Sequence, residues 1–116
     1  MTELFRPILN AFEKHGFNYS KIEEQSGEYY FEISQYTPEG EDWSVIIWFD
    51  GTPDGFVDSL ANLVEEFDPD EEAELWIGMR GKNGVPSSII ALVKDAEWKL
   101  EQLQNLLNDL QNGEEV

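Results

Sequence analysis

The chain has 116 residues, of which 41% are hydrophobic and 13% aromatic, and it contains no cysteine. These values predict a single domain over residues 1–116 with a hydrophobic core, and they exclude a disulfide framework and a thiolate metal site. The formal net charge of −18 repels nucleic acid and anionic lipid, so the sequence argues against direct binding to either.

The first residues carry Glu3 and Arg6 and lack a long apolar run, so a secretory signal is not predicted. No later segment reaches transmembrane length. We therefore expect a cytoplasmic protein without a membrane partner.

A first helix is predicted over residues 3–15, where Phe5, Ile8, Leu9 and Phe12 recur at helical spacing. Pro7 is expected to disturb its early turns, and Gly16 is expected to end it.

Three alternating runs follow at residues 17–24, 28–36 and 43–50, with turns at 25–27 and 37–40. Alternation of this kind predicts an antiparallel meander with one buried face. The buried set is Tyr29, Phe31, Ile33, Trp43, Val45, Ile47 and Phe49. The opposite face carries Tyr30, Tyr36, Ile46 and Trp48 beside Glu32. It is more apolar than a solvated face needs, so either another element covers it or it is an interface.

Two short helices are predicted next. Thr52 followed by Pro53 is a typical helix start, and Asp68 followed by Pro69 repeats it. The second of these helices is expected over residues 69–79, and residues 81–86 form a polar connector. The predicted fold is therefore α+β: an N-terminal helix, a three-stranded antiparallel sheet, two short helices and a long C-terminal helix.

The last helix is predicted from residue 86 or 87 to 111, and it carries an apolar seam with alternating spacings of four and three. The seam consists of Ile89, Val93, Ala96, Leu100, Leu103, Leu107 and Leu110. It either packs on its own domain or pairs with its twin in a homodimer. A helix of about 25 residues extends roughly 37 Å, so we expect it to extend past the domain.

The charge is concentrated in the middle of the chain. Residues 22–79 contain 17 Asp and Glu and no Lys, Arg or His. Solvated surfaces normally mix charges of both signs, and pairs four residues apart on a helix gain from opposite charge. The absence of such pairs favours a surface that attracts cations or basic proteins.

A calcium loop explains the acidic run poorly. Asp68, Asp70 and Glu72 match the first, third and fifth positions of an EF-hand, but Ala73 stands where Gly is needed and Met79 where Glu is needed. We predict no metal and no cofactor.

Catalysis is not predicted either. His15 is the single histidine, and no Ser, His and acid pattern is indicated. The segment at residues 81–84 lacks the order of a phosphate-binding loop. Paired carboxylates could act as acid and base, but none has a distinguishing partner.

A charged binding surface fits the pattern better, because a helix holds carboxylates in rows as a nucleic acid holds phosphates. The predicted partner-binding residues are Asp54, Asp58, Glu65, Glu66, Asp68, Asp70, Glu71, Glu72 and Glu74, with Glu39, Glu41 and Asp42 as a second cluster. Charge reversal of Asp70, Glu71, Glu72 and Glu74 is expected to abolish binding without unfolding the domain.

Two resemblances add to this interpretation. Residues 50–103 resemble short acidic proteins encoded on mobile elements and phages of Gram-positive bacteria, some of them near antirestriction genes. The shared features are GFV at residues 55–57, FDPDEEAELW at 67–76, MRGKNGVPSS at 79–88 and DAEW at 95–98. The order of elements and the charge are also similar to one group of DNA-mimicking anti-CRISPR proteins, although the C-terminal helix here is longer.

The resemblances imply a DNA-mimicking inhibitor of a host defence nuclease, in a bacterial cytoplasm. The alternative is an acidic adaptor or oligomeric interaction module of a mobile element. It would use the apolar seam and the face with Tyr30, Tyr36 and Trp48.

Overall fold

The computed structural model describes residues 2–23, 27–79, 85 and 88–112. The predicted turn at residues 25–26 and most of the connector at 81–86 lie outside this part. The described elements are α1 (Thr2–Lys14), β1 (Asn18–Glu23), β2 (Tyr29–Tyr36), β3 (Asp42–Phe49), α2 (Pro53–Glu66), α3 (Pro69–Ile77) and α4 (Ile89–Asn112). This order confirms the predicted α+β fold.

The helix α1 packs its apolar stripe into the core. Phe5, Ile8 and Phe12 are each at most 3% exposed, as their spacing predicts. Pro7 lies inside the helix, which nevertheless runs unbroken from Thr2 to Lys14. Gly16 follows with a φ of 80°, a left-handed conformation that ends helices and favours glycine.

The sheet has the order β1-β2-β3, and both pairings are antiparallel. The predicted core face is confirmed, because Phe31, Ile33, Trp43, Ile47 and Phe49 are all buried. Aromatic rings from α1, α2 and the sheet meet there. The ring of Phe31 lies 5.3 Å from those of Phe12 and Phe56, edge to face, a favoured arrangement for buried aromatic pairs.

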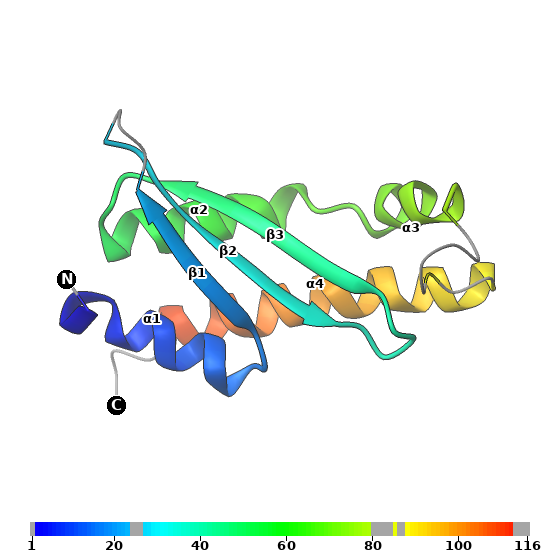
Figure 1. The fold of residues 1–116 in the computed structure, drawn as a ribbon, viewed down its shortest axis with the longest axis horizontal. Helices are drawn as coiled ribbons and strands as arrows, with labels where there is room; N and C mark the ends of the chain where they lie inside the picture. The colour runs from blue at the N-terminus through cyan, green and yellow to red at the C-terminus, as the bar shows by residue number, and fades with distance from the viewer. Residues whose placement is uncertain (1, 24–26, 80–84, 86–87, 113–116) are drawn as a thin grey trace.

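The helices α1, α2 and α4 cover one face of the sheet, and α2 and α4 lie behind the strands in Figure 1, while α3 packs on α4 beyond the end of the sheet. No described element covers the other face. Tyr36 is 70% exposed, Ile46 50% and Trp48 48%, while the ring of Tyr30 lies 4.5 Å from that of Trp48. This face was expected either to be covered by another element or to be an interface. In the described structure no element covers it.

Both predicted helix starts are confirmed. The side chain of Thr52 accepts a hydrogen bond from the backbone of Gly55 at 3.0 Å, and the carboxylate of Asp68 accepts one from Asp70 at 2.9 Å. Each cap satisfies a backbone N–H that the first helical turn leaves without a partner.

The long helix α4 follows the length of the molecule. Its 24 residues correspond to about 36 Å, and the longest extent of the molecule is 42 Å. In Figure 1 the first turns of α4 extend past the end of the sheet, and α3 packs beside them. The molecule accommodates α4 by being elongated, with extents of 42 × 35 × 22 Å.

The apolar seam of α4 is mostly used inside the domain. Ala96, Leu103 and Leu107 are buried, and Leu100 and Leu110 are half-buried. These five are not free to form a continuous seam with a second copy, because α4 packs on α1, α2 and α3. Ile89 and Val93 remain 47% and 39% exposed.

Candidate functional site

A row of exposed carboxylates runs along α2. Asp54, Asp58 and Glu65 are spaced by four and seven residues, so an ideal helix places them within about 40° of one another. All three are exposed, because the opposite side of α2 buries Phe56 and Leu60 in the core.

Further exposed carboxylates follow in the chain at the junction of α2 and α3. Glu66 and Asp68 are exposed there, and Asp68 also caps α3. The first turn of α3 contains Asp70, Glu71 and Glu72, where the helix dipole favours negative charge. Asp70, Glu71 and Glu74 are exposed. The cap formed by Asp68 and the dipole of α3 thus stabilise carboxylates that repel one another.

We call the exposed carboxylates of this region the acidic array: Asp54, Asp58, Glu65, Glu66, Asp68, Asp70, Glu71 and Glu74. None of the eight forms an ion pair with another described residue; the ion pairs of the described chain use cations from α1, His15 or Lys99. The region therefore presents uncompensated negative charge.

Glu72 differs from its predicted role in an exposed row. Its side chain is only 17% exposed, and Oε2 accepts hydrogen bonds from Lys99 Nζ at 2.7 Å and from Trp76 Nε1 at 2.8 Å. The i and i+4 positions of Glu72 and Trp76 turn both toward α4, so Glu72 fixes α3 in place.

The second predicted cluster divides in the same way. Glu39 and Asp42 are exposed, but Glu41 is 1% exposed, which corrects its assignment to a binding surface. The turn between β2 and β3 directs it inward. The backbone N–H of Thr37 donates to the carbonyl of Glu41, and the N–H of Glu41 donates to the Thr37 hydroxyl, at 3.0 and 2.8 Å. Gly40, with a φ of 95°, allows this closure.

Lys99 lies at the centre of a buried polar cluster. Its Nζ donates to Glu41 Oε1 at 2.8 Å, and both side chains are 1% exposed. The ammonium also lies 4.4 Å from the centre of the Trp76 ring and 5.9 Å from that of Trp43, within the range of cation–π attraction. The cluster joins the β2–β3 turn, α3 and α4.

Asp95 completes this cluster one turn before Lys99. It is 1% exposed, and its carboxylate accepts hydrogen bonds from the Thr37 hydroxyl at 2.6 Å and the backbone of Glu39 at 3.3 Å. Burial raises the pKa of Glu41 to about 7, and the neighbouring Asp95 adds to the rise while Lys99 opposes it. Oε2 of Glu41 has no hydrogen-bond partner in the described structure.

The buried cluster was not predicted from the sequence, although the sequence contains a signal for it. Asp95 and Lys99 stand four residues apart within the apolar pattern of the last helix, next to Leu92, Ala96 and Leu103. Charged residues are almost never fully buried unless paired. An i,i+4 pair on the core side of a helix therefore predicts a buried partner, though not which one.

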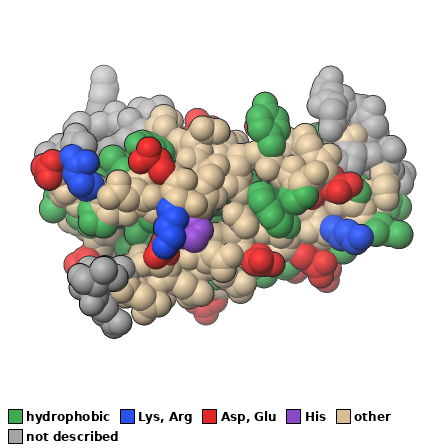
Figure 2. Space-filling model, turned by 90° about the horizontal axis from the view of Figure 1, so that it is seen from below, with side chains coloured by type: hydrophobic (Ala, Val, Ile, Leu, Met, Phe, Trp, Pro, Cys, Tyr) green, Lys and Arg blue, Asp and Glu red, His purple; other side chains and the backbone are tan. Residues whose placement is uncertain are grey.

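The other side of the molecule has mixed charge. Figure 2 shows Lys and Arg side chains and the histidine among separate carboxylates on the face seen from below. Arg6 pairs with Glu3 at 2.7 Å, and Lys14 and His15 contact Asp109 at 3.2 and 3.0 Å. This face has the alternation of signs that the acidic array lacks.

Comparisons of the chain with protein-family models, with curated proteins and with solved structures give no match. The two resemblances seen in the sequence stay predictions. Among the described helices, none combines the length and apolar character needed to cross a lipid bilayer. The described His, Asp and Glu side chains form no group of three suited to hold a metal ion.

Proposed function

We propose that this chain is a non-enzymatic inhibitor that presents carboxylates in place of nucleic-acid phosphates to the basic groove of a bacterial defence nuclease, such as an RNA-guided nuclease or a restriction enzyme. The observation that carries the proposal is the acidic array, whose eight exposed carboxylates form no ion pair with a described residue.

The array is held by folded elements, which suits it to imitate phosphates. Side chains four residues apart on a helix have Cβ atoms about 5–6 Å apart. Asp54 with Asp58, Glu66 with Asp70, and Asp70 with Glu74 have this sequence spacing, although the α2–α3 junction separates the middle pair. Along α2 the row from Asp54 to Glu65 covers about 16 Å of helix axis. A basic groove that contacts DNA phosphates can bind such a surface without base recognition.

Binding of this kind is electrostatic. Opposite charges on the two surfaces speed association. The affinity falls steeply when salt screens the contacts. The inhibitor is therefore expected to act at low salt and to lose affinity as salt rises.

The test removes charges inside and outside the array in equal number. One variant carries Asp70→Asn, Glu71→Gln and Glu74→Gln; the matched control carries Glu13→Gln, Glu97→Gln and Glu101→Gln, which are exposed carboxylates of α1 and α4. Cleavage of plasmid DNA by a panel of RNA-guided and restriction nucleases is measured against inhibitor concentration at low and high salt. The array variant is expected to need about tenfold more protein for half inhibition, and the control to match the parent.

Failure to inhibit any nuclease of the panel contradicts the proposal. An equal loss of inhibition in the two variants would show that inhibition depends on the net charge of the protein and not on the acidic array.

The alternative, an adaptor that binds through apolar contacts, is favoured by a different observation. Leu75 and Ile90, at the end of the molecule where α3 meets α4, are 68% and 69% exposed, and the sheet face around Trp48 is uncovered. Such contacts keep or gain strength at high salt. Sedimentation at low and high salt separates the two: self-association that grows with salt supports the adaptor.

A further inference from the structure

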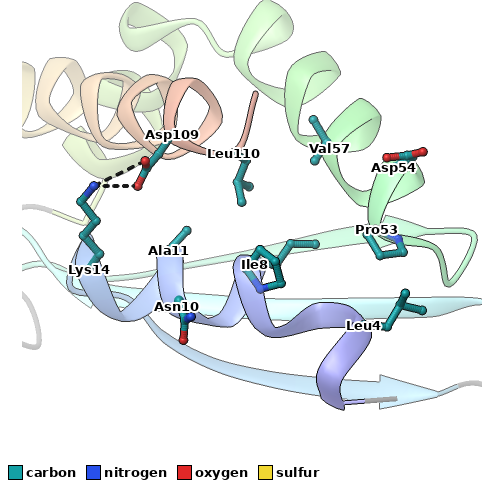
Figure 3. Close-up of a pocket in the computed structure, with 11 residues that line it drawn as sticks. Leu4, Ile8, Asn10, Ala11, Lys14, Pro53, Asp54, Val57, Asp109 and Leu110 are labelled. Atoms are coloured by element: carbon teal, nitrogen blue, oxygen red, sulfur yellow. Dashed lines mark hydrogen bonds and ion pairs between the residues drawn. The ribbon is translucent and has the colours of Figure 1, made fainter. Parts of the chain in front are cut away.

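Three helices surround an apolar groove at the end of the molecule near the N-terminus. It measures about 480 Å³ and is lined by residues of α1, the start of α2 and the end of α4. Ile8 and Ala11 form its floor and are buried, while Val57 and Leu110 line it from α2 and α4 (Figure 3). A volume of this size, with mostly apolar walls and few polar groups, is typical of small-molecule sites.

The charged groups of the groove lie at its two ends. At one end Lys14 contacts Asp109 at 3.2 Å, and the pair closes that end in Figure 3. At the other end Asp54 lies beside Pro53 on the first turn of α2, and Leu4 lines the groove from α1. The Asp54 carboxylate is exposed and has no ion pair or hydrogen bond with another described side chain.

We propose that this groove binds a small ligand with an apolar body and a cationic, ammonium-type end. The body lies against Ile8, Ala11 and Leu110, and the cation lies at Asp54. This site would hold such a ligand whether or not the acidic array binds a nuclease.

Charge complementarity selects the cation over an anion. Lys14 is already matched by Asp109, whose pKa is held below its ordinary value by the hydrogen bond with His15 and by Lys14. An anionic ligand would have to displace Asp109 from Lys14 and approach a chain of net charge −18. A cation meets a carboxylate that no described side chain pairs with, and a favourable overall potential.

Octylammonium and octanoate are suitable probes, because they share an alkyl chain of similar length and carry opposite charges. Isotope-labelled protein is titrated with each, and amide chemical shifts are followed by NMR. Octylammonium is expected to shift residues of α1, the start of α2 and the end of α4, and to bind about two- to fivefold more tightly than octanoate, the size of a solvent-exposed ion pair.

Asp54→Asn should remove the preference for octylammonium. Glu65→Gln should keep it, since that carboxylate lies on the same row about 16 Å further along α2. Leu4→Ser, at a side chain that is 59% exposed, should weaken the binding of both probes without affecting folding. Val57→Trp should fill the groove and so weaken the binding of both probes.

Tighter binding of octanoate, an unchanged preference in Asp54→Asn, or shifts confined to other surfaces would each overturn the proposal. Because the readout is ligand binding and not nuclease inhibition, its failure leaves the proposed function untouched.

Discussion

The carboxylates of this protein fall into two groups, one exposed to solvent and one buried in a hydrogen-bonded cluster. Those of the acidic array are exposed and form no ion pair with a described residue, whereas Glu41 and Glu72 both bind the ammonium of Lys99, and the buried Asp95 accepts hydrogen bonds from Thr37 and Glu39 beside them. The two groups meet within α3, where Glu71 is exposed and the next residue, Glu72, faces Lys99. The contrast teaches that high acidic content alone does not define a binding surface, since part of it holds the fold together.

Removal of Lys99 should have the largest effect, because it tests whether the buried carboxylates depend on its charge. Lys99→Met keeps the apolar stem beside Trp76 but leaves two carboxylates, Glu41 and Glu72, without their cation. We expect a loss of about 3–5 kcal/mol in the free energy of unfolding, the cost of leaving a buried charge unpaired. Urea denaturation measures it. Lys94→Met, at an exposed position on the same helix, is the control and should change stability by less than about 0.5 kcal/mol.

Charge reversal at the neighbouring positions Glu71 and Glu72 of α3 compares an exposed carboxylate directly with a paired one. Glu72→Lys places a second cation against Lys99 and should cost on the order of 2–3 kcal/mol, less than the loss of Lys99 because Glu72 is 17% exposed. Glu71→Lys, one residue earlier and exposed, should be close to neutral. This expectation replaces the sequence-based one that all four acids of α3 can be reversed without unfolding. Equal costs at the two positions in urea denaturation would contradict the assignment.

The pKa of Glu41 predicts a pH dependence. Its folded value of about 7 lies above the ordinary value of 4.5, so between these pH values the folded state holds a proton that the unfolded state has released. This stabilising contribution is complete below the unfolded pKa and is lost as pH rises through about 7. Glu41→Gln should therefore be more stable than the parent near pH 8, by roughly 3 kcal/mol, with little difference near pH 4.

Urea midpoints of the two proteins across this pH range provide the measurement. Asp42→Asn, the exposed neighbour, should follow the parent at every pH. A parent and a Glu41→Gln curve that stay parallel would show that Glu41 titrates normally.

The smallest expected effect concerns the array itself. Asp70 and Glu74 are like charges at i,i+4, so Glu74→Gln should stabilise the fold by about 0.2–0.5 kcal/mol at low salt. Added salt should remove most of that gain. Thermal unfolding at two ionic strengths checks it, and a loss of stability would mean that Glu74 has a structural contact.

Local patterns in the sequence predicted much of the fold. The alternation at Phe31, Ile33 and Ile47 identified the buried sheet face, and the Thr52–Pro53 and Asp68–Pro69 pairs located the starts of α2 and α3 to the residue. These signals are local, because caps and strand alternation depend on neighbours within a few residues.

The candidate site was predictable only as a set of acids. Whether Glu41 or Glu72 points to solvent depends on Lys99, which lies 58 and 27 residues away in sequence. A count of mid-chain charges does not contain that pairing. The groove beside Asp54 was equally out of reach, because three helices far apart in the sequence form it.

The attachment of α3 has a consequence for local opening. This helix buries only Ala73 fully, so its hold on the domain depends heavily on Glu72 and Trp76 against Lys99. Releasing it would uncover little apolar surface, and the backbone amides of α3 should exchange with solvent faster than those of α2, which anchors Phe56 and Leu60 in the core. The helix with the highest share of acidic residues in the described structure is therefore expected to open more readily than α2.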